Sequence, residues 1–289
     1  MGGHKLSFPE WRDRVEANIA RGLPEISPMS GFRNVPICVC ASGPSLRDHI
    51  GALKRMQKRG AAVMAVNRAY EFIVRNGVIP DYFVLFDPDE AMADVVAPRC
   101  ERTIHLIASQ AHPKVFDALQ DRKVAIWHAL TAGFNVTREG DRPERESDAL
   151  FSVFGTRHLM AMGAHVGMHA MALATFFGHF DLHMFGMDGS RRKAGAHSVK
   201  QARNEEVFEI AYEGRSYLMD PPLMVQADWF EKVIKIQKDK FNLTFHGHGL
   251  LAAIWKKETH GKSDKRIDLP QGHAIREWRV PREEGRIVV

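Results

Sequence analysis

VPICVCASGPSL occupies residues 35–46, where an apolar run ends abruptly in Ser-Gly-Pro-Ser and a helical pattern follows. A continuous apolar run of this kind is typical of a parallel strand that is buried on both faces. Gly43 allows a ligand to approach the backbone closely, because it has no Cβ atom. Ser45 is expected to cap the next helix with Asp48 as its capping-box partner, and such a helix start suits a phosphate. The alternative is a plain turn between a strand and a helix.

Strands and helices alternate from Val35 onward, which predicts a doubly wound, mostly parallel α/β sheet of the Rossmann-like class with helices on both faces. The strands are expected at 35–41, 62–66, 80–86, 103–108, 124–127, 182–185 and 242–246. The longer helices are expected at 45–59, 68–76, 160–177 and 222–240, with a hairpin over 207–218 that turns at Glu213-Gly214. Ser7 and Glu10 form a capping-box pattern, which predicts a separate helix to about Arg21.

Three segments follow from this pattern. Residues 1–34 form an N-terminal helical extension, 35–255 a Rossmann-like domain, and 256–289 a charged C-terminal tail. Residues 131–157 are rich in Gly, Arg, Glu and Asp, and they interrupt the alternation. A surface loop is expected there, and an ordered lid over a site is the alternative.

The composition is ordinary for a soluble globular protein, with 45% hydrophobic and 26% charged residues, a net charge of +5 and a pI of about 9.1. This mild positive charge permits an anionic substrate, but it is spread along the chain and no nucleic-acid-binding motif accompanies it, so a nucleic-acid partner is not expected. No apolar run has the length of a membrane span, and the first residues lack the apolar core of a signal peptide. Cys38 and Cys40 are expected to be core residues on one face of a strand, which favours a reducing, cytoplasmic setting. A homo-oligomer is compatible with the composition.

Polar residues recur at the carboxyl ends of four expected strands, where open parallel sheets bind ligands. These residues are Ser42 with Gly43 and Ser45, Asn67, Asp87 with Asp89, and Asp188 with Ser190. A nucleotide-type ligand is therefore expected at this edge. Asp87 and Asp89 could hold Mg²⁺ against a diphosphate. Alternatively, Asp87 accepts hydrogen bonds from ribose or base, and Asp89 only caps the next helix.

His197 is the best candidate for a general base, because it lies in an irregular stretch just after Asp188 and an imidazole titrates near neutral pH. A loop histidine in solvent is the alternative. Arg191, Arg192 and Lys193 could neutralise phosphate charge or form a solvated run. His165 and His169 have a metal-compatible spacing, but the HExxH glutamate is missing. The chain has no Walker A, GxGxxG or GxSxG pattern, which argues against P-loop kinases, ordinary NAD enzymes and α/β-hydrolases.

Four motifs in this order resemble the MptE-like family: Ser42-Gly43-Pro44-Ser45-Leu46, Val66-Asn67-Arg68-Ala69, Ile79-Pro80-Asp81-Tyr82 leading to Asp87, and Gly186-Met187-Asp188 with His197. That family includes archaeal 6-hydroxymethylpterin diphosphokinases and motility accessory factors that glycosylate flagellin. The order of motifs is also similar to that of bacterial CMP-dependent sialyltransferases. The likeness covers roughly residues 35–255.

The resemblance implies that the loop from Ser42 through Gly43 and Pro44 to Ser45 cradles phosphate. It also implies that Asn67 and Asp87 contact ribose, base or metal-bound phosphate. Further residues implied at the nucleotide are Gly167, at the start of a lining helix, and Gly186 and Ser190 beside Asp188. The histidine that the sialyltransferases use is missing near Ser216-Tyr217-Leu218-Met219, and Ser42 replaces their loop asparagine, which puts sialyl transfer in doubt.

The sequence therefore predicts a transferase that uses a nucleotide-activated donor, a CMP- or UDP-sugar, with Asp188 and His197 as the catalytic pair. Its acceptor would be a small molecule, a glycan or a protein. The first alternative is an ATP- and Mg²⁺-dependent diphosphokinase that acts on a hydroxymethyl group, with Asp87, Asp89 and Asp188 holding Mg²⁺. The second alternative is a nucleotide-binding module without catalysis.

Overall fold

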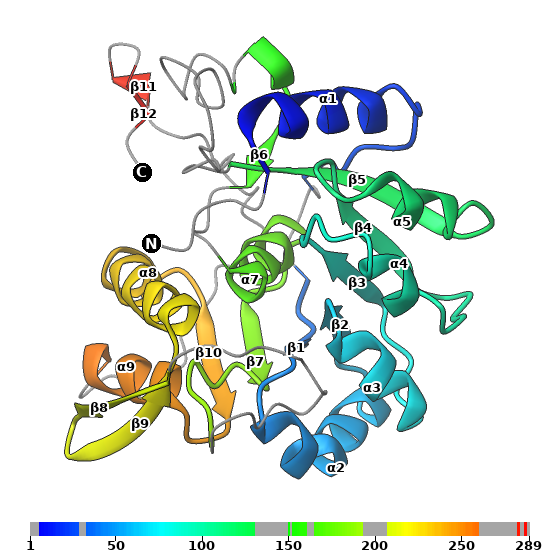
Figure 1. Ribbon diagram of the computed structural model, residues 1–289. Coiled ribbons are helices and arrows are strands. Elements are labelled where there is room, and N and C mark those ends of the chain that lie inside the picture. Colours follow the sequence, from blue (N-terminus) through cyan, green and yellow to red (C-terminus); the bar gives the residue numbers. More distant parts are fainter. Residues whose placement is uncertain are drawn as a thin grey trace.

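One parallel sheet of eight strands forms the centre of the molecule (Figure 1). The computed structural model describes residues 6–28, 33–130, 150, 152–160, 165–192 and 207–259, and the backbone of 282–283 and 286–287. The strand order is β10-β7-β1-β2-β3-β4-β5-β6, and every neighbouring pair is parallel. The strands are β1 (Ile37–Cys40), β2 (Ala62–Val66), β3 (Tyr82–Leu85), β4 (Ile104–Ala108), β5 (Lys123–Ala129), β6 (Leu159–Met160), β7 (Asp181–Phe185) and β10 (Asn242–His246). The predicted fold class is confirmed.

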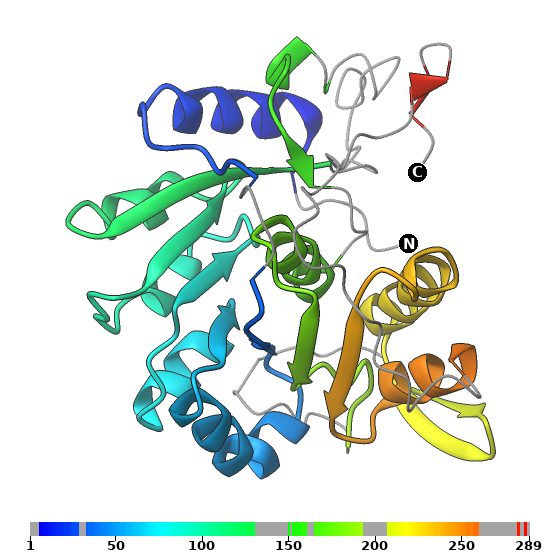
Figure 2. The ribbon, with the colours of Figure 1, turned by 180° about the vertical axis from the view of Figure 1, so that it is seen from behind.

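Helices cover both faces of this sheet (Figures 1 and 2). The helices are α1 (Phe8–Ile19), α2 (Ser45–Lys58), α3 (Ala69–Arg75), α4 (Met92–Val95), α5 (Pro113–Asp117), α7 (Val166–Phe176), α8 (Pro221–Gln237) and α9 (Leu250–Glu258). Residues of α7, α8 and α9 share one apolar cluster with one face of the sheet, and residues of α2 to α5 share a second cluster with the other face.

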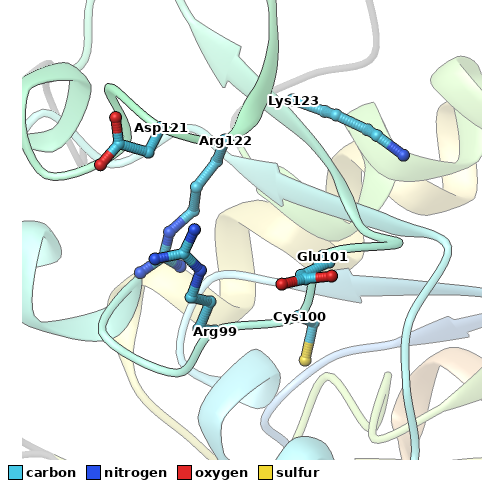
Figure 3. Close-up of a pocket in the computed structure, with 6 residues that line it drawn as sticks. All are labelled: Arg99, Cys100, Glu101, Asp121, Arg122 and Lys123. Carbon is cyan, nitrogen blue, oxygen red and sulfur yellow. The ribbon is translucent and has the colours of Figure 1, made fainter.

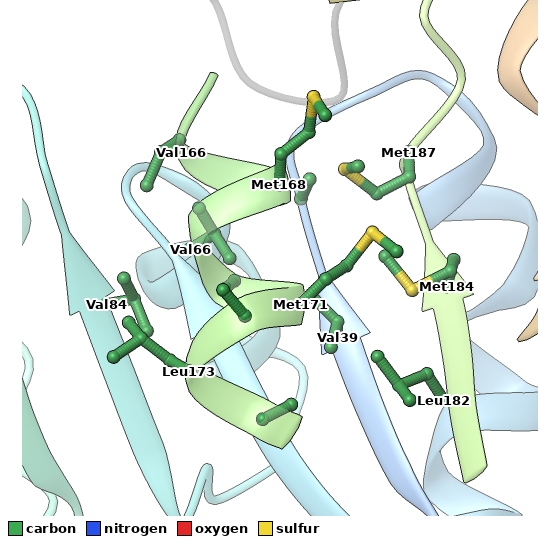
Figure 4. Packing of buried hydrophobic residues seen from close by; sticks show 14 of the residues in the cluster. Val39, Val66, Val84, Val166, Met168, Met171, Leu173, Leu182, Met184 and Met187 are labelled. Carbon is green, nitrogen blue, oxygen red and sulfur yellow. The ribbon is translucent and has the colours of Figure 1, made fainter. Parts of the chain in front are cut away.

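Strand β1 shows why the sheet is buried on both sides. Ile37 and Val39 belong to the cluster under α7, whereas Cys38 and Cys40 belong to the cluster under α2. All four residues are fully buried, and the cysteines are free thiols. Figure 4 shows Val39 packed with Met171 of α7 and with Leu182 and Met184 of β7. Apolar residues on both faces are what a parallel central strand requires.

The first helix lies beside the carboxyl end of β4. Its capping box is formed as predicted, because the backbone N–H of Ser7 donates to the Glu10 carboxylate at 3.0 Å and the Ser7 side chain accepts from the first turn. Trp11 is fully buried and its ring contacts Phe154 edge-on. The side-chain amide of Asn18 donates to the carbonyl oxygen of Ser109 at 2.8 Å. These contacts attach α1 to the sheet.

A small hairpin of β8 (Phe208–Tyr212) and β9 (Arg215–Met219) lies outside the main sheet. Its turn residues Glu213 and Gly214 have φ angles of 48° and 72°. Two positive φ angles are typical of the tight turn that matches the twist of a hairpin, so the predicted turn is confirmed. The backbone of β11 (Arg282–Glu283) and β12 (Arg286–Ile287) forms another antiparallel pair.

Two elements differ from the sequence-based expectation. The helix expected at 160–177 begins only at Val166, because Leu159 and Met160 instead pair with β5 as strand β6. Residues 250–258, where no helix was expected, form α9, whose apolar side chains Leu250, Leu251 and Ile254 are buried. The expected tail therefore starts inside a helix. Residues 131–149 and 151 lie outside the described residues, so the loop and lid interpretations stay predictions there. At the end of the expected loop, Leu150 and Phe154 are instead helical and buried with Trp11, so that part is not a surface loop.

Candidate functional site

The strand order reverses between β1 and β7, and this point brings together two distant turns. Strands β1 to β6 follow one another in one direction, whereas β7 and β10 lie on the other side of β1. The turn after β1 packs on the turn after β7, because the backbone N–H of Gly43 donates to the carbonyl oxygen of Gly186 at 2.9 Å. In open α/β sheets this is the position where ligands bind. Ser42, Pro44 and Ser190 belong to the same two turns.

Glycine is required on both sides of this contact. A Cβ atom added at Gly43 would overlap Asp188 Oδ2 and the carbonyl oxygen of Gly186. Gly186 has a φ angle of +64°, and its added Cβ would overlap the carbonyl oxygen of Ala41. Only a residue without a side chain allows the two backbones to come this close.

Asp188 connects both turns to α2 and α9. Its Oδ2 accepts a hydrogen bond from the backbone N–H of Ser45 at 3.0 Å, and its backbone carbonyl accepts one from the N–H of Leu251 at 3.2 Å. The residue is only 7% exposed. Burial raises the pKa of Asp188, and hydrogen bonds from the backbone and side chain of Ser45 oppose that rise. The carboxylate thus lies at the positive end of α2, where a negative charge is stabilised.

This arrangement corrects the expected helix cap. Ser45 is the first residue of α2, the N-cap position is Pro44, and the Ser45 side chain hydrogen-bonds Asp188. Asp48 pairs with Arg192 instead of closing a capping box. The Asp188 carboxylate, 143 residues away in the sequence, therefore accepts the hydrogen bond of the Ser45 amide, at the helix start that the sequence predicts to bind phosphate.

The turn after β10 completes this neighbourhood, and sequence analysis did not give it a role. A Cβ atom at Gly247 would lie 2.7 Å from Ser45 Oγ and 3.3 Å from Asp188 Oδ1. A Cβ atom at Gly249 would overlap the Asp188 backbone. The Gly-x-Gly pattern directly after an expected strand was the available signal, since paired glycines mark close backbone approach.

Helix α7 begins beside the same turns. The backbone N–H of Gly167 donates to His165 Nδ1 at 3.1 Å, so His165 caps the helix. An added Cβ at Gly167 would overlap the sulfur of Met187. Gly167 thus lies against the turn that contains Asp188, and its contact with a nucleotide stays a prediction. Burial lowers the pKa of His165 to about 4. His169, its partner in the metal-compatible spacing, is buried and stacks on Phe86.

Asn67 follows β2 at the next position along the same edge. Its φ angle is 44°, a left-handed conformation that asparagine tolerates better than most residues. Its side-chain Oδ1 accepts from the backbone N–H of Phe86 at 3.3 Å, which links the ends of β2 and β3.

Asp87 and Asp89 lie in the turn after β3. Asp87 Oδ1 accepts from the backbone N–H of Asp89 at 3.2 Å, and Asp89 Oδ1 accepts from that of Ala91 at 3.1 Å. The second contact stabilises the turn before α4, whose N-cap position is Ala91 and not Asp89. Among the described residues, no group of three or more Asp, Glu, His or Cys side chains is arranged to hold a metal. Their assignment as Mg²⁺ ligands stays a prediction.

Arg191 serves the protein interior rather than a solvated basic run. Its Nε donates to Asp220 Oδ2 at 2.8 Å, and the two side chains are only 3% and 4% exposed. Asp220 also caps α8 by accepting from the backbone N–H of Leu223 at 3.0 Å. The backbone N–H of Arg191 donates to the carbonyl oxygen of Leu218 at 2.7 Å. These contacts attach the segment after Asp188 to the hairpin and to α8.

Four of the expected site residues therefore lie at the same edge, just after the carboxyl ends of adjacent strands: Asp188 after β7, Gly43 after β1, Asn67 after β2 and Asp87 after β3. Ser190 is buried, and its hydroxyl accepts from the backbone N–H of Leu250 at 3.4 Å. His197 and Lys193 lie outside the described residues.

A pocket of about 410 Å³ lies at the opposite edge, before β4 and β5 (Figure 3). It is lined by Arg99, Cys100, Glu101, Asp121, Arg122 and Lys123. Arg122 donates to the carbonyl oxygens of Ala97 and Pro98, which gives it a role in the turn after α4. None of the site residues expected from the sequence lines this pocket, so the candidate site remains at the carboxyl edge.

The fold and this edge define a doubly wound α/β domain whose loops converge where the strand order reverses. The chain belongs to the MptE-like family: the family model described as "6-hydroxymethylpterin diphosphokinase MptE-like" matches residues 14–193. Among solved structures, the MAf glycosyltransferase from Magnetospirillum magneticum AMB-1 has a similar fold, with a TM-score of 0.59 and 17% sequence identity. That match covers 86% of this chain and 37% of the MAf chain, so this chain spans well under half of the other. No curated protein matches the sequence. In the described part of the chain, every helix is too short or too polar to cross a membrane.

Proposed function

We propose that the protein is a transferase that binds a nucleotide-activated donor at the carboxyl edge of β7, β1, β2 and β3. Membership of the MptE-like family and a fold shared with a glycosyltransferase support a transferase-like role. The observation that carries the proposal is the backbone contact of Gly43 with Gly186, which joins the two turns at the point where strand order reverses.

The transferred group in this proposal is a glycosyl unit from a CMP- or UDP-sugar. An acceptor hydroxyl attacks the anomeric carbon, the bond from that carbon to the phosphate oxygen breaks, and the nucleotide leaves with the electron pair. His197 takes the hydroxyl proton. Backbone amides of the loops and the amino ends of helices stabilise the leaving phosphate.

Asp188 is a positioning residue in this proposal. Its buried carboxylate already accepts the Ser45 amide, so it holds the loop after β1 against the turn after β7. A phosphate that used the same amide would have to displace a negative charge from the end of α2. We therefore do not assign the phosphate to the Ser45 amide.

The second candidate is ATP-dependent diphosphoryl transfer to a hydroxymethyl acceptor, which the description of the matching family model favours. Mg²⁺ would then bind Asp87 and Asp89 and neutralise the phosphate charge. Both carboxylates accept hydrogen bonds from backbone amides of their own turn, which favours metal-independent binding over this candidate. A nucleotide-binding module without catalysis is the third candidate.

Thermal-shift measurements with CMP, UDP, GDP and ATP, each with and without Mg²⁺, separate these candidates. We expect CMP or UDP to raise the melting temperature without metal. A rise with ATP that requires Mg²⁺ would support the diphosphokinase instead. No rise with any nucleotide would contradict donor binding.

A variant pair tests the place of binding. Asp87→Asn is expected to reduce the nucleotide-induced rise in melting temperature at least threefold, because Asp87 is assigned to contact the ribose or the base. Asp117→Asn removes the same charge from an exposed ion pair on α5 and should leave the response unchanged. Equal responses in both variants would remove Asp87 from the site. Full turnover by His197→Ala would likewise remove His197 as the base.

A further inference from the structure

Two imidazole nitrogens face each other across the outer strands of the sheet. His183 Nδ1 on β7 lies 3.1 Å from His246 Nε2 on β10. His246 pairs in register with Phe185, so His183 lies two residues earlier on the same face of β7. Two nitrogens at this distance share either one proton or one cation.

The surroundings fix the orientation of both rings. The His246 ring stacks on Phe185 with a centroid separation of 4.0 Å and an interplanar angle of 5°. The other nitrogen of His183, Nε2, lies 3.7 Å from Asp181 Oδ1. A carboxylate beside Nε2 favours the tautomer that carries its proton there, which leaves Nδ1 with a lone pair directed at His246. His49 on α2 supplies a third imidazole ring 6.2 Å from that of His246.

This geometry suits a metal ion. With Zn–N bonds of about 2.0–2.1 Å, two nitrogens of a tetrahedral zinc site lie about 3.3 Å apart, close to the observed separation. The His183 side chain is 17% exposed, so a solvated ion can reach the pair.

We propose that His183 and His246 form a binding site for a late first-row divalent metal ion such as Zn²⁺, which joins β10 to β7. Imidazole nitrogen suits zinc, copper and nickel. Because no set of three ligands is already arranged around one point in the described residues, the two imidazoles are the preformed part of the site. Water or His49 completes the coordination. The proposal is independent of the nucleotide site.

Calorimetric titration of the chelator-treated full chain with Zn²⁺ tests the proposal. We expect one equivalent to bind and to raise the melting temperature. His183→Gln and His246→Gln should each weaken binding at least tenfold, because each removes a ligand. His248→Gln is the matched control: it removes an exposed histidine two residues from His246, and it should bind Zn²⁺ as the unaltered chain does.

The competing explanation is a hydrogen-bonded imidazole pair without a metal. It would be established if both glutamine variants bind Zn²⁺ as tightly as the His248→Gln control, or if none of the proteins binds it. A spectroscopic measurement guards against variants that fail to fold. With one equivalent of Cu²⁺, the electron paramagnetic resonance spectrum of the unaltered chain should show splitting from at least two nitrogen ligands, and a spectrum with one or none would overturn the proposal.

Discussion

The buried ion pair between Arg191 and Asp220 makes a measurable prediction about stability. Arg191→Met removes one charge and leaves the Asp220 carboxylate in an environment where it is only 4% exposed. Breaking such a pair from one side costs about 3–5 kcal/mol, since an unpaired charge remains away from water. A domain is typically stable by about 5–15 kcal/mol, so this loss would be a large part of the total.

Urea unfolding at pH 7, followed by circular dichroism, measures this loss. Asp220→Asn should also destabilise the protein, although its side-chain oxygen can still accept from the Leu223 N–H and keep the cap of α8. The double variant should be more stable than the sum of the two single losses predicts, by about 1–3 kcal/mol, because neither charge is then left alone. The control is Lys232→Met, which breaks an exposed pair with Asp228 and should change stability by less than about 0.5 kcal/mol. A loss below about 1 kcal/mol for Arg191→Met would refute the reasoning.

Three further predictions concern the turns and the buried titratable groups. Gly43→Ala should lower the melting temperature and abolish any nucleotide response, because its Cβ would overlap the turn after β7. The control is Gly51→Ala, whose Cβ would meet its nearest neighbour at 3.5 Å, and it should be neutral or stabilise by about 0.5–1 kcal/mol. Equal melting temperatures of the two variants would show that the turn can shift to accommodate a side chain. Burial raises the pKa of Asp188 above 3.8. The free energy of unfolding should therefore fall as the pH rises from 3.8 through that raised pKa, because the folded chain must then give up a proton that it holds more tightly than the unfolded chain does. Urea unfolding midpoints of Asp188→Asn should lack this fall. Burial lowers the pKa of His105 from 6.5 to about 4. The free energy of unfolding should therefore rise by about 3 kcal/mol as the pH increases from about 4 to 6.5, because in that range the unfolded chain binds a proton that the folded chain does not. An unchanged pH profile in His105→Gln would assign the rise to other groups.

The sheet could be predicted well because local patterns and tertiary structure agree over its strands. Strands β2 and β10 have the bounds expected from the sequence, since each is an apolar or alternating run with turn residues at both ends. Strand β6 was missed because it has only two residues, and its pairing with β5 depends on a neighbour about 30 positions away. Helix α9 was missed although Leu250, Leu251 and Ile254 have helical spacing, because the run is short and lies between glycines and a charged tail.

The candidate site was predictable in position but not in its internal contacts. Polar residues at strand ends indicated the edge of the sheet, because parallel strands present their carboxyl ends together. The cap of α2 could not be predicted, since its acceptor Asp188 lies 143 residues away and Ser45 with Asp48 offered a plausible local partner. Arg191 was misjudged for the same reason: a basic run is usually solvated, and only the fold shows that Asp220 meets it.

The strand order also bears on how the chain folds during synthesis. Strand β1 acquires β2 from the residues made directly after it, but its other edge is covered only by β7, about 140 residues later. Until the ribosome has released that part, the hydrogen-bonding groups of a fully buried strand stay open to any other extended chain. A product terminated near residue 160 should therefore aggregate, and chaperone dependence should decline once β7 has emerged.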